Sequence, residues 1–123
     1  TYQDQAHVLA EMLGYHCVFV HARRWTRGEY GNALLTRFPL LDFQRLALPK
    51  PARLPVEARC VLQCRLAHPE GDVHVWNTHL GLLATERRAQ VAVMIGISAF
   101  ILSTTSRQNS SGIIASNCDR VIA

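Results

Sequence analysis

Two polar residues near the end of an apolar stretch, Asn77 and His79, are the strongest candidates for chemistry in this sequence. They stand in Trp76–Gly81, and the alternation of a β-strand places both side chains on one face, at the C-terminal end of that strand. A sheet holds strand-end side chains rigidly where they can reach a cleft. A histidine there can donate a proton to a leaving oxygen or a hydrogen bond to a phosphate oxygen. The competing interpretation, a histidine satisfied by a backbone carbonyl, is the commoner one on spacing alone.

A second cluster, Glu29–Ala33, combines a permissive backbone with a side-chain amide. Gly31 lets the backbone turn or come close to a ligand, and Asn32 can both donate and accept hydrogen bonds. An ordinary turn before a strand is the alternative. Arg59, which we expect to begin a later strand, could meet a phosphate or lie at the surface as a solvated charge.

A basic segment with an aromatic residue, residues 23–29, suggests a different function. Such a group can contact phosphates while the indole stacks on a base, which would make it a non-catalytic module that binds anions or nucleic acid. A solvated loop is the commoner explanation of so short a run. The residues concerned are Arg23, Arg24 and Arg27 around Trp25.

The familiar metal and nucleotide motifs are missing from this sequence. It contains no HExxH, Cys-x-x-Cys, GxGxxG or Walker-type segment. Its 9 Asp and Glu residues are scattered singly, and none stands beside His79 in the sequence. His74 and His79 project from opposite faces of the expected strand, so they cannot share one metal ion. The residues by themselves therefore show neither a metal site nor a complete catalytic site.

Composition limits the classes of protein to consider. With 123 residues, 49% of them apolar and 18% charged, the chain resembles one small globular domain. A coiled coil, a collagen and an acidic disordered tail are excluded. The net charge of +4 suits an anionic partner such as a phosphate ester. Among the 13 cationic residues only Lys50 is a lysine, and arginine favours bidentate contacts with oxyanions.

The cysteines and the apolar segments bear on location. Cys60 and Cys64 are expected on one straight strand, about 13 Å apart, which is too far for a disulfide. We therefore expect the reduced thiols of a cytoplasmic protein. Val91–Leu102 is shorter than the roughly 20 residues of a membrane span, so no span is expected. The opening at Thr1 resembles the interior of a longer protein, and the oligomeric state is left open.

Hydrophobic periodicity and turn residues predict the elements that position these side chains. Asp4 is the expected N-cap of the first helix, Gly14 its stop, and Thr85 the N-cap of the last helix. The order helix, strands, helix predicts a mixed α and β domain with at least one sheet covered by helices. The expected helices are Asp4–Leu13 and a second from about Thr85, and the expected strands are Tyr15–Ala22, Ala33–Phe38, Leu40–Leu48, Arg59–Leu66 and Val73–Leu80.

Several segments together carry a family resemblance. Tyr30–Leu40 reads YGNALLTRFPL, Asn77–Gly81 reads NTHLG, and Glu86–Gln90 reads ERRAQ. Asp4-Gln5 before the first helix and Glu57–Arg59 before a strand follow the same order. Five segments in register, from Asp4 to about Met94, resemble the endonuclease/exonuclease/phosphatase family, which has the deoxyribonuclease I-like fold.

This resemblance implies an α/β (α+β) protein, a partial four-layer αββα sandwich with mainly antiparallel sheets. It also implies a metal-dependent phosphoesterase, using Mg or Mn, that hydrolyses a phosphate ester in nucleic acid, phospholipid or a small molecule. His79 matches the family histidine that bonds the phosphate or acts as general acid. Asn32 matches a position near the cleft, and we take Asn77 and Arg59 as further substrate-binding candidates.

The resemblance covers residues 1–94, the central part of such a domain. Residues 95–123 depart from it, as a divergent or out-of-frame tail that we expect to be an apolar helix followed by disorder. The metal-binding Glu and Asp of the family have no counterpart in this sequence, so we expect this chain to be inactive alone, and a non-functional truncated product is a further alternative. The phosphoesterase assignment requires His79 to face a phosphate-sized cleft beside Asn32.

Overall fold

Two helices and five strands follow one another over residues 4–108, the part of the chain that the computed structural model describes. Every strand pair is antiparallel. The predicted α+β class is therefore confirmed. The elements are α1 (Gln5–Leu13), β1 (His16–Trp25), β2 (Gly28–Thr36), β3 (Leu40–Ala47), β4 (Cys60–Leu66), β5 (Val73–Thr78) and α2 (Ala84–Gln108).

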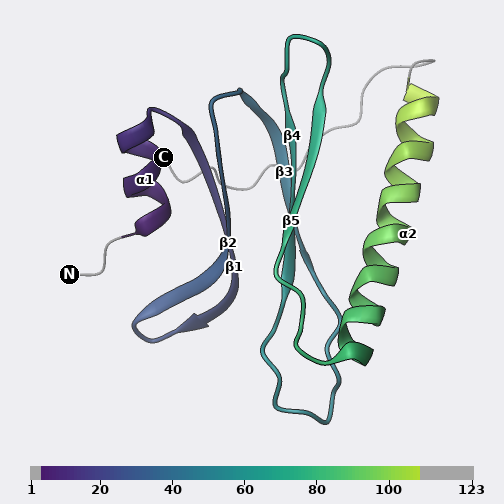
Figure 1. Ribbon diagram of the computed structural model, residues 1–123. Helices are drawn as coiled ribbons and strands as arrows, with labels where there is room; N and C mark the ends of the chain where they lie inside the picture. Colours follow the sequence, from purple (N-terminus) through teal and green to yellow (C-terminus); the bar gives the residue numbers. More distant parts are fainter. Residues whose placement is uncertain (1–3, 109–123) are drawn as a thin grey trace.

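The strands form two sheets that face each other, with a helix beside each (Figure 1). β1 and β2 make a two-stranded sheet, whereas β3, β4 and β5 make a three-stranded sheet with β4 in the middle. α1 contacts the first sheet, and α2 lies on the outer side of the second. The full four-layer sandwich stays a prediction, because Val91 and Ile95 of α2 are 40% and 64% exposed instead of packed against a sheet.

The hydrophobic core lies between the two sheets. Alternate residues of a strand share a face, so a row of every second residue marks the inner side of each sheet. Tyr30 and Leu34 of β2 pack against the core while remaining partly exposed. The buried rows are Val18, Val20 and Ala22 from β1, and Cys60, Leu62, Cys64 and Leu66 from β4.

α1 begins and ends where the sequence predicts. The Asp4 carboxylate accepts hydrogen bonds from the backbone N–H groups of Ala6 and His7, at 3.1 and 3.2 Å, and thereby caps the helix. Gly14 follows with φ of 65°, a left-handed conformation that ends the helix and directs the chain into β1.

The β1–β2 hairpin is longer than predicted. We expected the first strand to end at Ala22, residues 23–29 to form a loop and the next strand to begin at Ala33. Instead β1 continues to Trp25, and β2 begins at Gly28 after a two-residue turn. The register shifts at Ala22, where His21 pairs with Gly31 but Arg23 pairs with Tyr30. This bulge accommodates one extra residue, so the ladder continues where the polar sequence suggested a loop.

The boundaries near His79 also differ from the prediction. β5 ends at Thr78 rather than Leu80: the pairing with β4 ends at Thr78 and Val61, and the Gly81 N–H bonds to the side chain of Gln90. α2 begins at Ala84, which places Thr85 inside its first turn instead of at the N-cap.

α2 runs without interruption through Ile95 to Gln108. The tail that we expected to be disordered, residues 109–123, lies outside the described residues. Within the described part, neither helix has an apolar stretch of the length that a membrane crossing needs.

Replacing Gly31 by Ala should destabilise the protein, because an added Cβ would lie 1.9 Å from the Val20 carbonyl oxygen and 2.8 Å from the His21 Cα. Such overpacking costs about 3 kcal/mol where backbone must move. Gly96→Ala is the matched control, since a Cβ there meets nothing within 4 Å and lies in a helix. Denaturant titration should show a large loss for Gly31→Ala and a gain of up to about 1 kcal/mol for Gly96→Ala. Equal stability of Gly31→Ala and the wild type would contradict the described hairpin register.

Candidate functional site

His79 lies directly after β5, and its side chain is exposed. Its Nδ1 is 2.6 Å from the hydroxyl oxygen of Tyr30 on β2. Asn77, two residues earlier, donates from Nδ2 to the Ala33 carbonyl at 2.7 Å, and Ala33 also belongs to β2. Both side chains therefore reach toward the two-stranded sheet, as strand alternation predicts.

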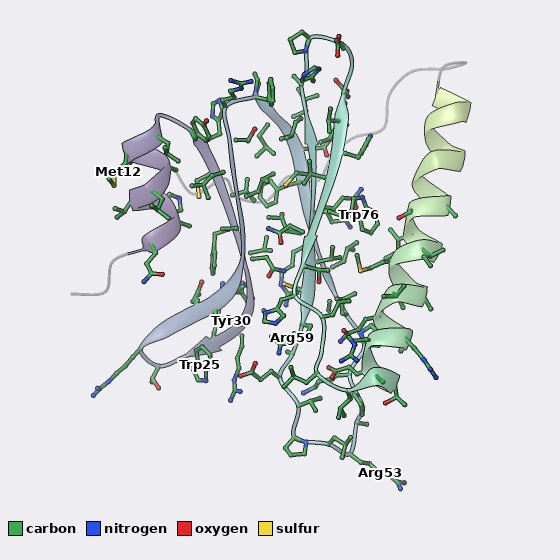
Figure 2. All side chains as sticks on the ribbon, in the orientation of Figure 1. Met12, Trp25, Tyr30, Arg53, Arg59 and Trp76 are labelled. Atoms are coloured by element: carbon green, nitrogen blue, oxygen red, sulfur yellow. The ribbon has the colours of Figure 1, made fainter. Side chains whose placement is uncertain are left out.

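The hydroxyl of Tyr30 is shared between His79 and Arg59. Figure 2 shows Tyr30 and Arg59 between the two sheets, with Trp76 on the other side of β5, near α2. Arg59 Nη1 donates to the Tyr30 oxygen at 3.3 Å, and the direction of this bond is certain because a guanidinium has only donors. Because the guanidinium cannot accept the Tyr30 proton, the hydroxyl is able to donate it to Nδ1 of His79. In that arrangement the proton of the neutral ring is on Nε2, and the exposed ring presents a hydrogen-bond donor to an anion.

Arg59 supports this arrangement from a buried position. We expected Arg59 to be the first residue of a strand, but β4 begins at the next residue, Cys60. Arg59 is 7% exposed. Nη2 pairs with the Glu57 carboxylate at 3.3 Å, and the buried Nε has no hydrogen-bond partner. The ion pair offsets the cost of burying a guanidinium. In this structure Arg59 holds the Tyr30 oxygen, and its direct contact with substrate stays a prediction.

The two asparagines cross-link the sheets beneath His79. Asn32 Nδ2 on β2 donates to the Cys60 carbonyl at 2.9 Å and lies 3.4 Å from the Asn77 carbonyl. The bond from Asn77 to Ala33 crosses in the opposite direction. The amide N–H groups of both residues therefore hold the sheets together, and a role for either in binding substrate stays a prediction.

A buried glutamine fixes the turn that follows His79. Gln90 of α2 is 0% exposed; its Oε1 accepts from the Gly81 N–H at 2.8 Å, and its Nε2 donates to the Pro49 carbonyl at 3.1 Å. Gln90 Nε2 also reaches the buried Glu86 carboxylate at 3.2 Å. That carboxylate lies where a Cβ of residue 81 would be, so any other residue there would have to displace the Glu86 side chain. From the sequence we expected Glu86 and Gln90 only to open a helix. Their four-residue spacing, which puts both on one helix face, is the one sequence feature that indicates their contact below this turn.

The basic segment is divided by the hairpin. Arg24 pairs with Glu29 across the strands at 2.8 Å. Arg23 instead places its guanidinium carbon 5.0 Å from the centre of the Trp25 ring. Arg27 lies in the two-residue turn. The four residues that we grouped in one loop thus have three different environments.

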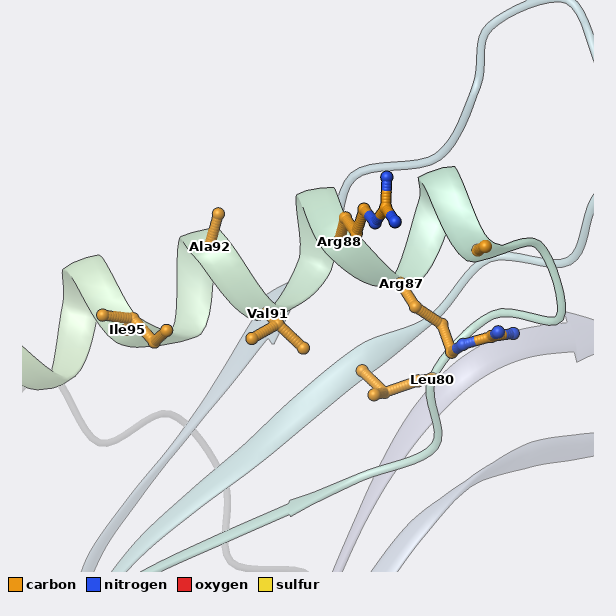
Figure 3. Close-up of a pocket in the computed structure, with 7 residues that line it drawn as sticks. Leu80, Arg87, Arg88, Val91, Ala92 and Ile95 are labelled. Atoms are coloured by element: carbon orange, nitrogen blue, oxygen red, sulfur yellow. The ribbon is translucent and has the colours of Figure 1, made fainter.

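An open hollow of about 670 Å³ lies beside the first turns of α2. Figure 3 shows Leu80 and Val91 pointing toward each other across it, with Arg87 and Arg88 at its rim. Leu80 is the residue after His79, but neither Tyr30 nor His79 lines the hollow. The hollow is therefore separate from the Tyr30–His79 contact.

The carboxylates near His79 do not fit magnesium or manganese. Glu57 is paired with Arg59, and Glu86 is 3% exposed against Gln90. Among residues 4–108, no group of three or more His, Cys, Asp or Glu side chains could hold a metal ion. We therefore assign no described residue to a metal and derive no step through one.

Comparison with known proteins gives partial matches. Over 72 residues, 57% of this chain, the sequence is 33% identical to "Uncharacterized protein YbhP" of Escherichia coli (strain K12), and equally to that of Shigella flexneri. The chain spans 27% of the length of these relatives. No family model and no solved structure matches it. Membership of the endonuclease/exonuclease/phosphatase family therefore stays a prediction.

The buried thiols next to this site should be unreactive in the folded protein. Burial raises the pKa of the Cys60 thiol, and it raises that of Cys64 to about 11, so both remain protonated at neutral pH. Iodoacetamide at pH 7.5 should therefore label neither residue until the protein is unfolded, which peptide mass spectrometry can measure. Cys17, which is partly exposed, is the internal comparison. Rapid labelling of Cys60 in the native protein would contradict the packing described here.

Proposed function

We propose that this chain is part of a metal-dependent phosphoesterase, and that its own contribution is to bind the phosphate ester and protonate it at His79. The observation that supports this most is the contact between Tyr30 and His79, with Arg59 behind it. Three segments distant in the sequence converge there on one exposed imidazole. A histidine kept only as a structural residue would need no such support at a solvent-exposed position.

The same contact serves both protonation states of the ring. In the neutral state Tyr30 donates to Nδ1, and Nε2–H is a donor for a phosphate oxygen. In the imidazolium state Tyr30 accepts from Nδ1–H, because a hydroxyl has one proton and two acceptor positions. His79 can then give the Nε2 proton to a leaving oxygen, and a positioned acid of this kind accelerates a reaction by about 10² to 10⁴.

The chain spans 27% of the length of YbhP. We therefore propose hydrolysis, with its Mg or Mn ion, for a whole protein of that length and not for this chain alone. We propose a cytoplasmic location, supported by the three described cysteines, which are all free. The natural substrate within the phosphate esters is addressed in the next subsection.

Inorganic phosphate should bind at His79. In a titration followed by histidine-ring ¹⁵N NMR, we expect the His79 nitrogens to shift with a Kd on the order of 1 mM, as for one small anion on a few donors. His74 is the matched control, since it is a second exposed histidine, within β5, and pairs with Arg65 on β4. The variants His79→Gln and His74→Gln assign the signals.

Three outcomes would contradict the proposal. Equal shifts of His74 and His79 would indicate non-specific attraction to a basic protein. No shift of His79 at saturating phosphate would show that the ring is not part of an anion site. If phosphate binds at His79 but the full-length relative does not hydrolyse bis-p-nitrophenyl phosphate with any divalent metal, the chain would be a non-catalytic anion-binding module.

A further inference from the structure

The bulge at Ala22 places three side chains on one face of the hairpin. Asn32 pairs with Val20 and reaches the second sheet, so this pair lies on the inner face. Tyr30, two residues from Asn32, shares that face, and the shifted register places Arg23 directly opposite Tyr30. Trp25 follows on the same side as Arg23, because alternate residues of a strand share a face. The bulge therefore turns Arg23 and Trp25 toward the side that holds His79.

These side chains form a row of rings that ends at His79. The centres of the Trp25 and Tyr30 rings are 6.4 Å apart, and those of Tyr30 and His79 are 6.3 Å apart. Figure 2 shows Trp25 and Tyr30 close together at the same end of the sheets. Trp25 is 48% exposed, so one part of its ring is open to a ligand while Arg23 covers another.

The charge on this row suits a polyanion. Arg24 is neutralised by Glu29, whereas Arg23 and Arg27 form no ion pair with any residue from 4 to 108. Two unpaired cations therefore flank an exposed indole. Proteins that bind single-stranded nucleic acid use exposed aromatic rings, on which bases stack, together with cations that contact the phosphates. A lipid surface would instead require apolar residues at the hairpin tip, which reads Thr26-Arg27.

We propose that Arg23, Trp25 and Tyr30 form a base-binding subsite, and that the phosphate ester bound at His79 is a phosphodiester of single-stranded nucleic acid. This inference rests on the proposed function for its phosphate, but the stacking surface stands on separate residues. Bases of a duplex are stacked on each other, so they do not offer a face to Trp25. The subsite therefore selects an unpaired strand.

The test compares two fluorescein-labelled strands of about eight nucleotides, within the site size of small single-strand binders. One is oligothymidylate, and the other has the same phosphates but abasic sugars. Fluorescence anisotropy on the whole chain should show about tenfold tighter binding of oligothymidylate, as expected for one base stacked on an aromatic ring. Trp25→Ala should abolish this preference and Trp25→Phe should retain part of it.

Charge is controlled separately. Arg23→Ala should weaken the binding of both strands by a few fold and lower the salt dependence, because it removes one phosphate contact. Arg53→Ala removes the same charge from the distant β3–β4 connection, where Figure 2 labels it, and should leave both affinities unchanged. An equal effect of the two variants would overturn the subsite as the source of binding.

The outcomes separate this inference from the proposed function. Equal affinity for the two strands would overturn the subsite, even if His79 still binds phosphate. If Trp25→Ala removes the base preference, the stacking surface is supported. If His79→Gln then binds oligothymidylate with unchanged affinity, the role of His79 is contradicted. Tighter binding to phosphatidylglycerol vesicles than to oligothymidylate, also lost in Trp25→Ala, would overturn nucleic acid as the ligand.

Discussion

A single hydroxyl group, that of Tyr30, connects the parts of the molecule on which the functional interpretation depends. It accepts a hydrogen bond from Arg59 before β4 and contacts Nδ1 of His79 after β5. Because arginine can only donate, the Tyr30 hydroxyl retains a proton for the imidazole, and we propose that it donates this proton to Nδ1, which puts the ring proton on Nε2 toward a ligand. The ion pair between the buried Arg59 and the exposed Glu57 helps to keep the guanidinium in place. Without the hydroxyl, His79 would be one more exposed histidine on a basic protein.

Polar contacts between the sheets make this arrangement possible. Asn32 and Asn77 bond to backbone carbonyls of the opposite sheet in both directions, so the sheets keep a fixed spacing at the end where the apolar core stops. Unpaired amides in such a position would cost free energy, whereas bonded ones hold one relative placement of the two sheets. Gln90 acts in the same way on the turn after His79. The site is thus supported by side-chain amides more than by hydrophobic packing.

Local sequence signals predicted a good part of this structure. The Asp4 cap, the Gly14 stop and the common face of Asn77 and His79 depend on neighbouring residues, and each is found as expected. The length of the hairpin was wrong, because the bulge at Ala22 and its pairing with β2 are long-range features that a polar segment does not reveal. The contacts of Tyr30 with residues 29 and 49 positions away are equally invisible in the sequence. The metal of the resembling family has no fitting group of residues in the described part.

The ring ¹⁵N shifts of His79 in the wild type and in Tyr30→Phe test whether Tyr30 sets the proton of His79 on Nε2. Both proteins are measured at the same alkaline pH. We expect Nδ1 of the wild-type ring to have the shift of an unprotonated nitrogen, and Tyr30→Phe to move the His79 shifts toward those of the exposed His74. A wild-type His79 protonated on Nδ1, or one whose shifts do not respond to Tyr30→Phe, would contradict this expectation.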